Sequence, residues 1–181
     1  MEAMYYVQKL FLSLQHVKNL ELGPRCFKVL SALLRRGLWI PIPKQDCLRL
    51  KLQMDKLSLS LVLRLLGSFP DLETLVIERT YLPYPAGVGR GSYASYLLKC
   101  DLLHLKSVDI KNFEESDIAG EPILKLVQLL LDKAMVLEKM VIKVNDLRGL
   151  SSTHNSSDYI KITRTLLSYP RSSLKAVVVL R

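Results

Sequence analysis

The sequence predicts an α/β fold in which short strands and helices alternate along 181 residues. Three observations indicate this fold. Apolar residues two positions apart recur in short stretches, and this spacing places both side chains on one face of a strand. Between these stretches, apolar residues lie three and four positions apart, as is typical of an amphipathic helix. After three of the strands, a polar residue suited to a turn follows at one fixed offset.

The clearest strand unit runs from Leu137 to Leu147. It fits the leucine-rich repeat pattern L-x-x-L-x-L-x-x-N-x-L, with Met140 and Ile142 in two of the leucine positions. The side-chain amide of Asn145 can satisfy main-chain groups that a sharp turn leaves unpaired. Since one such unit cannot bury its own apolar face, further copies are expected in the chain.

Five further copies, some of them partial, follow the same offsets. The two fuller ones are Leu72–Leu82, with Thr80 as the polar turn residue, and Cys47–Leu57, with Asp55 in that position. Aligned on the last strand residue, the six copies are 30, 25, 33, 32 and 37 residues apart, at Leu22, Leu52, Ile77, Ile110, Ile142 and Val179. The last copy takes Leu174, Val177 and Val179 as its apolar residues. These repeats are mostly longer than the usual ~20–29 residues and leave room for an outer helix. We therefore predict a leucine-rich-repeat-like solenoid, with an ordinary doubly wound α/β sheet as the alternative.

Helices are expected between the strands. The apolar stripes that indicate them fall at residues 5–15, 27–34, 61–66, 93–103, 122–131 and 160–167. Pro122 suits the first position of its helix. Residues 81–92, rich in Gly and Pro, are expected to form a loop. Loops are also expected at the acidic stretch 113–121 and at the Ser/Thr/Asn-rich stretch 151–158.

Composition narrows the class of protein. The chain contains 49% hydrophobic residues and no run of 18 apolar residues, so no membrane-spanning helix is expected. Its first residues do not resemble a secretory signal peptide. The three cysteines, Cys26, Cys47 and Cys100, are widely spaced, which favours reduced, buried thiols in the cytoplasm or nucleus over a disulfide framework or a zinc site.

The net charge of +9 is uneven. Residues 1–67 carry +7 and residues 150–181 carry +4, whereas the two middle segments, 68–104 and 105–149, carry −1 each. A basic surface can attract nucleic acid or an acidic protein. The chain lacks the interleaved aromatic and basic residues that single-strand binders use, so nucleic-acid binding is the less favoured alternative.

Signatures of catalysis are weak. The Gly-x-Gly-x-Gly-Ser stretch at 87–92 lacks the lysine of a phosphate-binding loop. None of His16, His104 and His154 has a partner at metal-ligand spacing. The carboxylates at 114–117 form a charge run typical of a solvated loop. We therefore expect no catalytic residue, no metal, no cofactor and no enzymatic activity.

The strands predict a binding surface instead. In each strand, the residues that flank the core pair point away from the core. In a leucine-rich solenoid these rows line the concave face. The ten residues in question are Asn19, Glu21, Arg49, Lys51, Thr74, Val76, Ser107, Asp109, Lys139 and Val141. They combine both signs of charge with two valines expected to be exposed, a mixture that suits protein recognition better than phosphate-backbone binding.

Longer stretches of the sequence carry a family resemblance. In the second half they are His104–Phe113, Leu126–Ala134, Val136–Ile142 and Leu166–Ser173, and in the first half they are Ser13–Leu22 and Ser68–Ile77. The second half resembles the FBD module found at the C-terminal end of plant F-box/leucine-rich-repeat proteins. The first half resembles the repeats of the same proteins. The sequence differs from the family pattern after Phe113. The family has a glycine soon after this phenylalanine, whereas here the glycine, Gly120, lies further along the chain.

The resemblance implies a domain division and a role. Residues 1–100 would be the leucine-rich repeat region, and residues 101–181 an FBD module that continues the solenoid. Full-length members resemble substrate-recruiting subunits of cullin-based ubiquitin ligases, in which the F-box binds a Skp-type adaptor. No F-box precedes the repeats in this sequence, so we expect an unknown protein partner and no binding of the adaptor. The chain would be a fragment or a truncated relative that keeps the recognition end.

Overall fold

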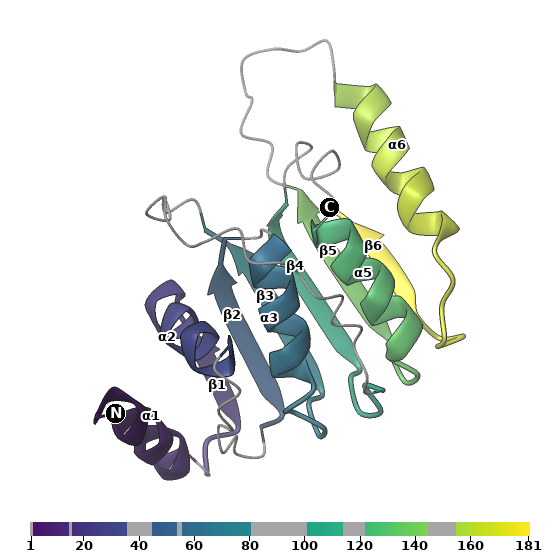
Figure 1. Cartoon of the computed structure of the whole chain (residues 1–181). Coiled ribbons are helices and arrows are strands. Elements are labelled where there is room, and N and C mark those ends of the chain that lie inside the picture. The colour runs from purple at the N-terminus through teal and green to yellow at the C-terminus, as the bar shows by residue number, and fades with distance from the viewer. Residues whose placement is uncertain are drawn as a thin grey trace.

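The computed structural model describes residues 2–14, 16–35, 45–53, 56–80, 101–113, 122–144 and 155–181. Strands and helices alternate along this part of the chain (Figure 1). In chain order the elements are α1 (Glu2–Ser13), β1 (Asn19–Leu22), α2 (Pro24–Arg35), β2 (Cys47–Leu52), α3 (Lys56–Leu66), β3 (Thr74–Arg79), β4 (Ser107–Phe113), α5 (Pro122–Lys133), β5 (Lys139–Val144), α6 (Asn155–Ser168) and β6 (Val177–Leu180). The predicted α/β class is confirmed.

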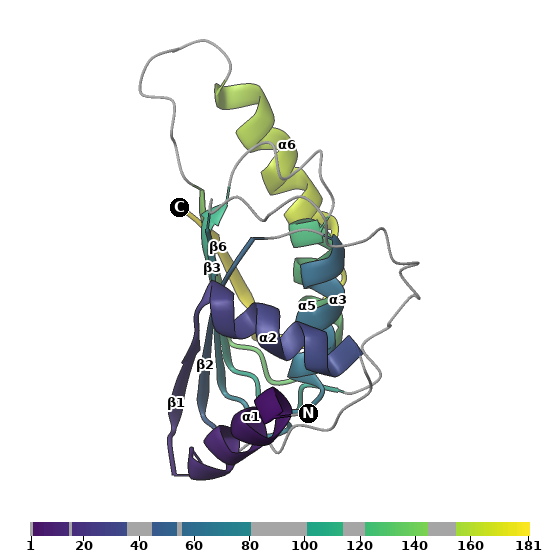
Figure 2. The same ribbon diagram turned by 60° about the vertical axis from the view of Figure 1, so that its left-hand side comes forward.

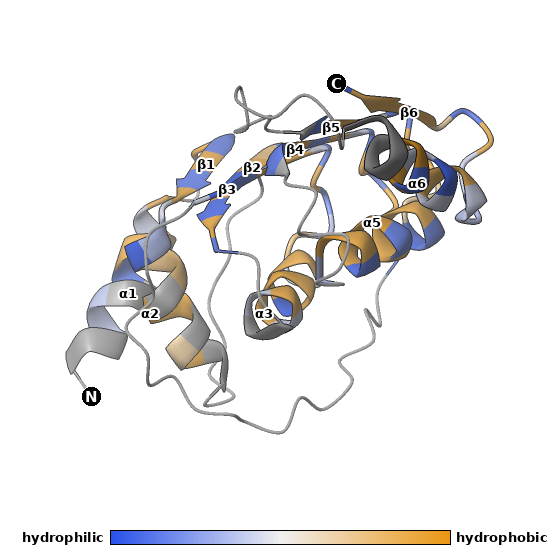
Figure 3. Ribbon diagram, turned by 90° about the horizontal axis from the view of Figure 1, so that it is seen from above, coloured by the Kyte–Doolittle hydropathy of each residue, from blue (hydrophilic) through white to orange (hydrophobic). Residues whose placement is uncertain are grey.

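The six strands form one parallel sheet in the order β1-β2-β3-β4-β5-β6. Each strand therefore pairs with the next one along the chain, and the strand order does not reverse as it does in a doubly wound sheet. Figures 2 and 3 show the described helices on one face of this sheet, with none of them on the other. The doubly wound alternative, which needs helices on both faces, is wrong for the described residues.

Two rows of apolar side chains on the helix-covered face form the core. The register aligns one row as Leu20, Leu48, Leu75, Val108, Met140 and Val178, and the next as Leu22, Leu50, Ile77, Ile110, Ile142 and Leu180. All of them belong to one hydrophobic cluster or pack against it. The six strands therefore share one continuous apolar interior.

The helices close this core with their apolar stripes. In α2 the buried residues Phe27, Leu30 and Leu33 are three apart, so they share one face of the helix. Helix α5 buries Leu126, Leu130 and most of its other apolar residues. Helix α3 lies between α2 and α5 and packs against both (Figure 3). Each helix thus covers its own part of the sheet.

A backbone ladder joins the strands just before they begin. The carbonyl oxygen of Lys18 accepts hydrogen bonds from the N–H groups of Asp46 and Cys47. The carbonyl oxygens of Asp46, Glu73 and Lys106 each accept two in the same way from the next strand's entry. This recurring arrangement fixes the register of neighbouring strands, because each pair of bonds defines which residues lie side by side.

That register corrects two of the predicted copies. In β2 the core residue that aligns with Leu22 and Ile77 is Leu50, not Leu52, so the predicted copy was two residues out of register. Because strand side chains alternate with period two, this shift kept the same face. In β6 the prediction was one residue out, so it assigned the wrong face. Val178 and Leu180 align with the core rows, whereas Val177 and Val179 align with the opposite face.

Other predictions from the sequence also need correction. Leu174, assigned to the core, is fully exposed. Helix α6 begins at Asn155, so the expected loop at 151–158 was too long. Cys26 is exposed and Cys47 is partly exposed, so neither is the buried thiol expected. Of the helix expected at 93–103, the described residues 101–103 are not helical and the others lie outside the described part, as do the loop at 81–92 and Asn145.

Asn112 lies at a β-bulge within β4 that the sequence pattern did not predict. A bulge between Ile110 and Phe113 adds a residue to β4, and Asn112 adopts a φ of 60°. Asparagine tolerates this left-handed conformation better than most residues. Its side-chain Nδ2 donates to the carbonyl oxygen of Arg79 at 3.2 Å. Asn112 therefore satisfies a main-chain group of the preceding strand, the role that the sequence pattern assigned to Asn145.

Candidate binding face

The ten predicted residues all lie on the sheet face opposite the helices, which we call the open face. One row across it contains Asn19, Cys47, Thr74, Ser107, Lys139 and Val177, and the next contains Glu21, Arg49, Val76, Asp109, Val141 and Val179. Lys51, Glu78 and Lys111 form a third row on β2 to β4. The shared orientation follows from the alternation of side chains along each strand. The predicted register of β2 was wrong by two residues, and an even error leaves each side chain on the same face.

The two valines predicted for the open face, Val76 and Val141, are buried, contrary to the expectation that they would be exposed. Val76 is 6% exposed and Val141 is 9% exposed, although neither belongs to the main core cluster. Neighbouring strands lie only ~4.8 Å apart, so a short side chain between longer ones loses most of its access to water. Val76 lies between Arg49 and Asp109 in its row. On β1 to β5 the accessible part of the open face is therefore mainly polar and charged, whereas Val177 on β6 is 57% exposed.

One charge cluster lies at β1 and β2. Lys51 Nζ is 2.7 Å from Glu21 Oε1, and Arg49 Nε is 3.6 Å from Glu21 Oε2. The hydrogen bond from Lys51 lowers the pKa of Glu21 below its ordinary value, and the same bond raises the pKa of Lys51. Both groups are thus held in their charged forms, with two cations sharing one carboxylate.

A second cluster lies at β4 and β5. Lys111 Nζ is 3.6 Å and Lys143 Nζ is 3.5 Å from the same oxygen, Asp109 Oδ2. Here too, one carboxylate is shared by two cations. Asp109 Oδ1 is buried and has no hydrogen-bond partner among the described residues. Only a quarter of the Asp109 side chain is exposed, so this cluster is more shielded from water than the first.

The sequence pattern missed several residues of the open face. Arg49 and Lys51 lie one row away from their predicted places because of the slip in β2. Cys47, which the pattern did not assign to this face, lies in the first row, and burial raises the pKa of its thiol. The missed residues are Cys47, Glu78, Lys111, Lys143, Val177 and Val179. Glu78, Lys111 and Lys143 could have been found by extending each strand one residue past its core pair, since alternation continues to the strand's end.

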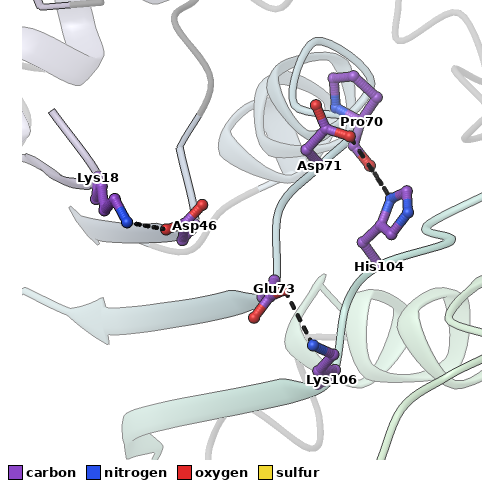
Figure 4. Close-up of polar contacts among 7 residues, drawn as sticks. All are labelled: Lys18, Asp46, Pro70, Asp71, Glu73, His104 and Lys106. Carbon is purple, nitrogen blue, oxygen red and sulfur yellow. Dashed lines mark hydrogen bonds and ion pairs between the residues drawn. The ribbon is translucent and has the colours of Figure 1, made fainter. Parts of the chain in front are cut away.

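Polar side-chain contacts join the segments that lead into neighbouring strands (Figure 4). Lys106 Nζ donates to Glu73 Oε1 at 2.9 Å, a bond that raises the pKa of Lys106, and Lys18 lies 3.9 Å from Asp46. His104 Nδ1 lies 3.1 Å from the carbonyl oxygen of Pro70. The exposed imidazole therefore contacts the turn after α3.

Among the described residues, no group of three or more His, Cys, Asp and Glu side chains is arranged to hold a metal ion. In the same part of the chain, no helix has the length and apolar character needed to cross a membrane. His16 lies just before β1 and is exposed, and His154 is outside the described residues. The main polar feature of the described residues is thus the charged open face, carried on a recurring backbone framework.

An all-parallel sheet in sequential order, backed by helices on one face, defines the class as an α/β protein built from repeated strand–helix units. Among known proteins, the chain is similar to a plant protein. An F-box/FBD/LRR-repeat protein of Arabidopsis thaliana is 31% identical over 157 residues, covering 86% of this chain and 33% of that protein. The chain thus spans about a third of the length of the relative it matches. No family model matches the sequence, and no solved structure matches it.

Proposed function

We propose that the chain is a non-enzymatic protein-interaction scaffold of the plant F-box/FBD/leucine-rich-repeat type. The name of its Arabidopsis relative supports this role, because it combines an F-box with leucine-rich repeats. The sequential parallel sheet also supports it, since stacked strand–helix units are the architecture of leucine-rich solenoids. In this proposal the open face is the concave face of a solenoid, residues 101–181 are the FBD module, and the chain acts as the substrate-recognition end of a ubiquitin-ligase adaptor.

The proposed partner binding is based on the open face. This face presents Lys51 and Arg49 beside Glu21, and Lys111 and Lys143 beside Asp109. Lys139 lies in the neighbouring row, and no described helix covers the face. Mixed charges of this kind steer encounters and set specificity, while a few desolvated contacts supply most of the affinity. The partner would be a protein that complements both signs of charge.

Charge reversal on this face tests the proposal. We expect Lys51→Glu with Lys139→Glu to remove most of the proteins captured by the wild-type chain from plant extract, identified by mass spectrometry. The matched control reverses two exposed lysines on helices, away from the open face, Lys125→Glu on α5 and Lys161→Glu on α6. Circular dichroism would verify that each variant folds. Identical partner sets for the wild-type and open-face variants would contradict the proposal.

A nucleic-acid-associated protein is the second candidate, favoured by the net charge of +9. Such binding would weaken steeply as salt rises, because each neutralised phosphate releases counterions. A filter-binding titration with duplex DNA and with RNA, at several salt concentrations, distinguishes the two candidates. Absence of binding near physiological salt would remove the second.

A further inference from the structure

We propose that the open face recognises an extended protein segment carrying two acidic side chains at positions i and i+4. This inference rests on the proposed interaction role and names the chemistry of the partner. One acidic side chain would bind the cations of the first cluster, Arg49 and Lys51. The other would bind the cations of the second cluster, Lys111 and Lys143.

The clusters have unused binding capacity. In each, two cations share a single carboxylate, and Glu78 lies between Lys51 and Lys111, so the four cations of the two clusters outnumber the three nearby carboxylates by one. A lysine ammonium has three donors and an arginine guanidinium has five, so the contact to Glu21 or Asp109 does not exhaust them. A second carboxylate can therefore join each cluster while the existing pairs stay in place.

The partial burial of these cations strengthens such contacts. The exposed fractions of the side chains are 40% for Arg49, 35% for Lys51, 28% for Lys111 and 44% for Lys143. Ion pairs that exclude water are screened less by salt than fully exposed pairs. A docked carboxylate would complete that exclusion. The clusters thus offer more than the diffuse attraction of a basic surface.

The spacing between the clusters selects the length of the segment. The cations of the first cluster are on β2, and those of the second are on β4 and β5. At ~4.8 Å per strand, the centres lie roughly 12 Å apart. In an extended chain, residues i and i+4 point to the same side and are separated by about 13 Å. An extended segment crossing the strands can therefore reach both clusters with acidic residues four apart.

Glu78 favours a segment with two separated acidic residues over a continuous polyanion. It lies between Lys51 and Lys111 in the third row, so a negative charge stands between the two cationic clusters. Val76 lies beside it in the second row and offers no charge. A nucleic-acid backbone or a run of consecutive acidic residues would place negative charge against Glu78. A pair of separated acidic residues avoids this repulsion.

Selection from a random library tests the proposal directly. A phage-displayed library of 12-residue peptides would be selected on the immobilised full chain. We expect acidic pairs at i and i+4 to be enriched at least fivefold over pairs at i and i+1. A selected peptide should then bind Lys51→Gln and Lys143→Gln variants about tenfold more weakly by fluorescence polarisation, and Lys125→Gln as tightly as the wild type. Thermal melts would verify that the variants remain folded.

The contrary outcomes are distinct. Recovery of no peptide, of peptides without the acidic pair, or of peptides that bind all variants equally would overturn the inference. Displacement of a selected peptide by an equal concentration of oligothymidylate of matched charge would also overturn it, in favour of nucleic acid. If any of these occurred while capture from extract still depended on Lys51 and Lys139, the interaction role would stand and only the acidic-pair chemistry would fall.

Discussion

Ser173 Oγ donates a 2.6 Å hydrogen bond to the main-chain carbonyl of Leu137, linking the turn before β6 to the turn before β5. Ser172 adds two bonds from the same turn, from its N–H to the carbonyl of Leu131 and from its hydroxyl to the carbonyl of Asp132. These carbonyls lie at the end of α5 and just after it, where helical partners run out. The Ser172–Ser173 pair therefore caps the preceding unit.

Replacing Ser173 with alanine should destabilise the chain. Ser173 is buried, and the change would leave the Leu137 carbonyl without its partner, at a cost of about 1–3 kcal/mol. Urea denaturation followed by circular dichroism measures the loss. The control is Ser168→Ala, because the hydroxyl of Ser168 is exposed and bonds within its own helix, to Thr165. Equal stability of the two variants would show that the bond across the two turns contributes nothing.

Gln45→Leu should stabilise the chain. By register, Gln45 occupies the position that Leu72 fills one strand later, and it is only 1% exposed. Neither of its side-chain amide atoms has a hydrogen-bond partner among the described residues. A buried amide without partners costs about 1–3 kcal/mol, so leucine should raise the free energy of unfolding by a similar amount. Gln128→Leu, at an exposed site on α5, is the control, and an unchanged melting temperature for Gln45→Leu would refute the prediction.

Two substitutions at Asn112 separate its roles. Asn112→Gly keeps the backbone at φ 60° without strain but loses the hydrogen bond to Arg79, whereas Asn112→Ala loses the bond and strains the backbone. A left-handed backbone costs an ordinary residue about 1–2 kcal/mol. We therefore expect alanine to be the more destabilising change by roughly 1 kcal/mol in chemical denaturation. The reverse order would mean that the bulge rearranges.

The contact between Lys51 and Glu21 predicts that the stability of the folded chain depends on pH. The pKa of Glu21 is lowered in the folded chain, so its stabilising effect is present above the unfolded pKa of about 4.3 and is lost as pH falls through the lower folded value. Carboxyl NMR titration should place Glu21 below an ordinary glutamate. In Lys51→Met its pKa should move up towards that ordinary value, while Lys125→Met leaves it unchanged. An unaltered Glu21 titration in Lys51→Met would show that the pair does not persist in solution.

The sequence alone predicts the α/β class, the strand positions and most of the binding face, because apolar alternation reports which face of a strand is buried. It fails where that signal is ambiguous. Leu48, Leu50 and Leu52 fit two registers equally well, and the choice is made by main-chain bonds to Lys18 and Glu73, which the pattern does not contain. In β6 both faces are apolar from Val177 to Leu180, so alternation is lost.

The sequence predicts only part of the charge clusters, for a similar reason. Their strand residues follow from alternation, but the pairing of Lys143 with Asp109 joins β5 to β4 and depends on register. Gln45 escaped notice because the slip in β2 placed Cys47 in its position. The bulge at Asn112 likewise depends on how β4 meets β5. Local periodicity reports faces, whereas contacts across strands are decided by the assembled sheet.

The sequential order of the sheet has a mechanical consequence. Each described strand is hydrogen-bonded only to its neighbours along the chain, and the first and last strands lie at opposite edges. Tension applied to the two ends would therefore load the strand pairs in series, and the molecule would lengthen by peeling one unit at a time from an edge. Single-molecule stretching would then record a staircase of small extensions in place of one abrupt rupture.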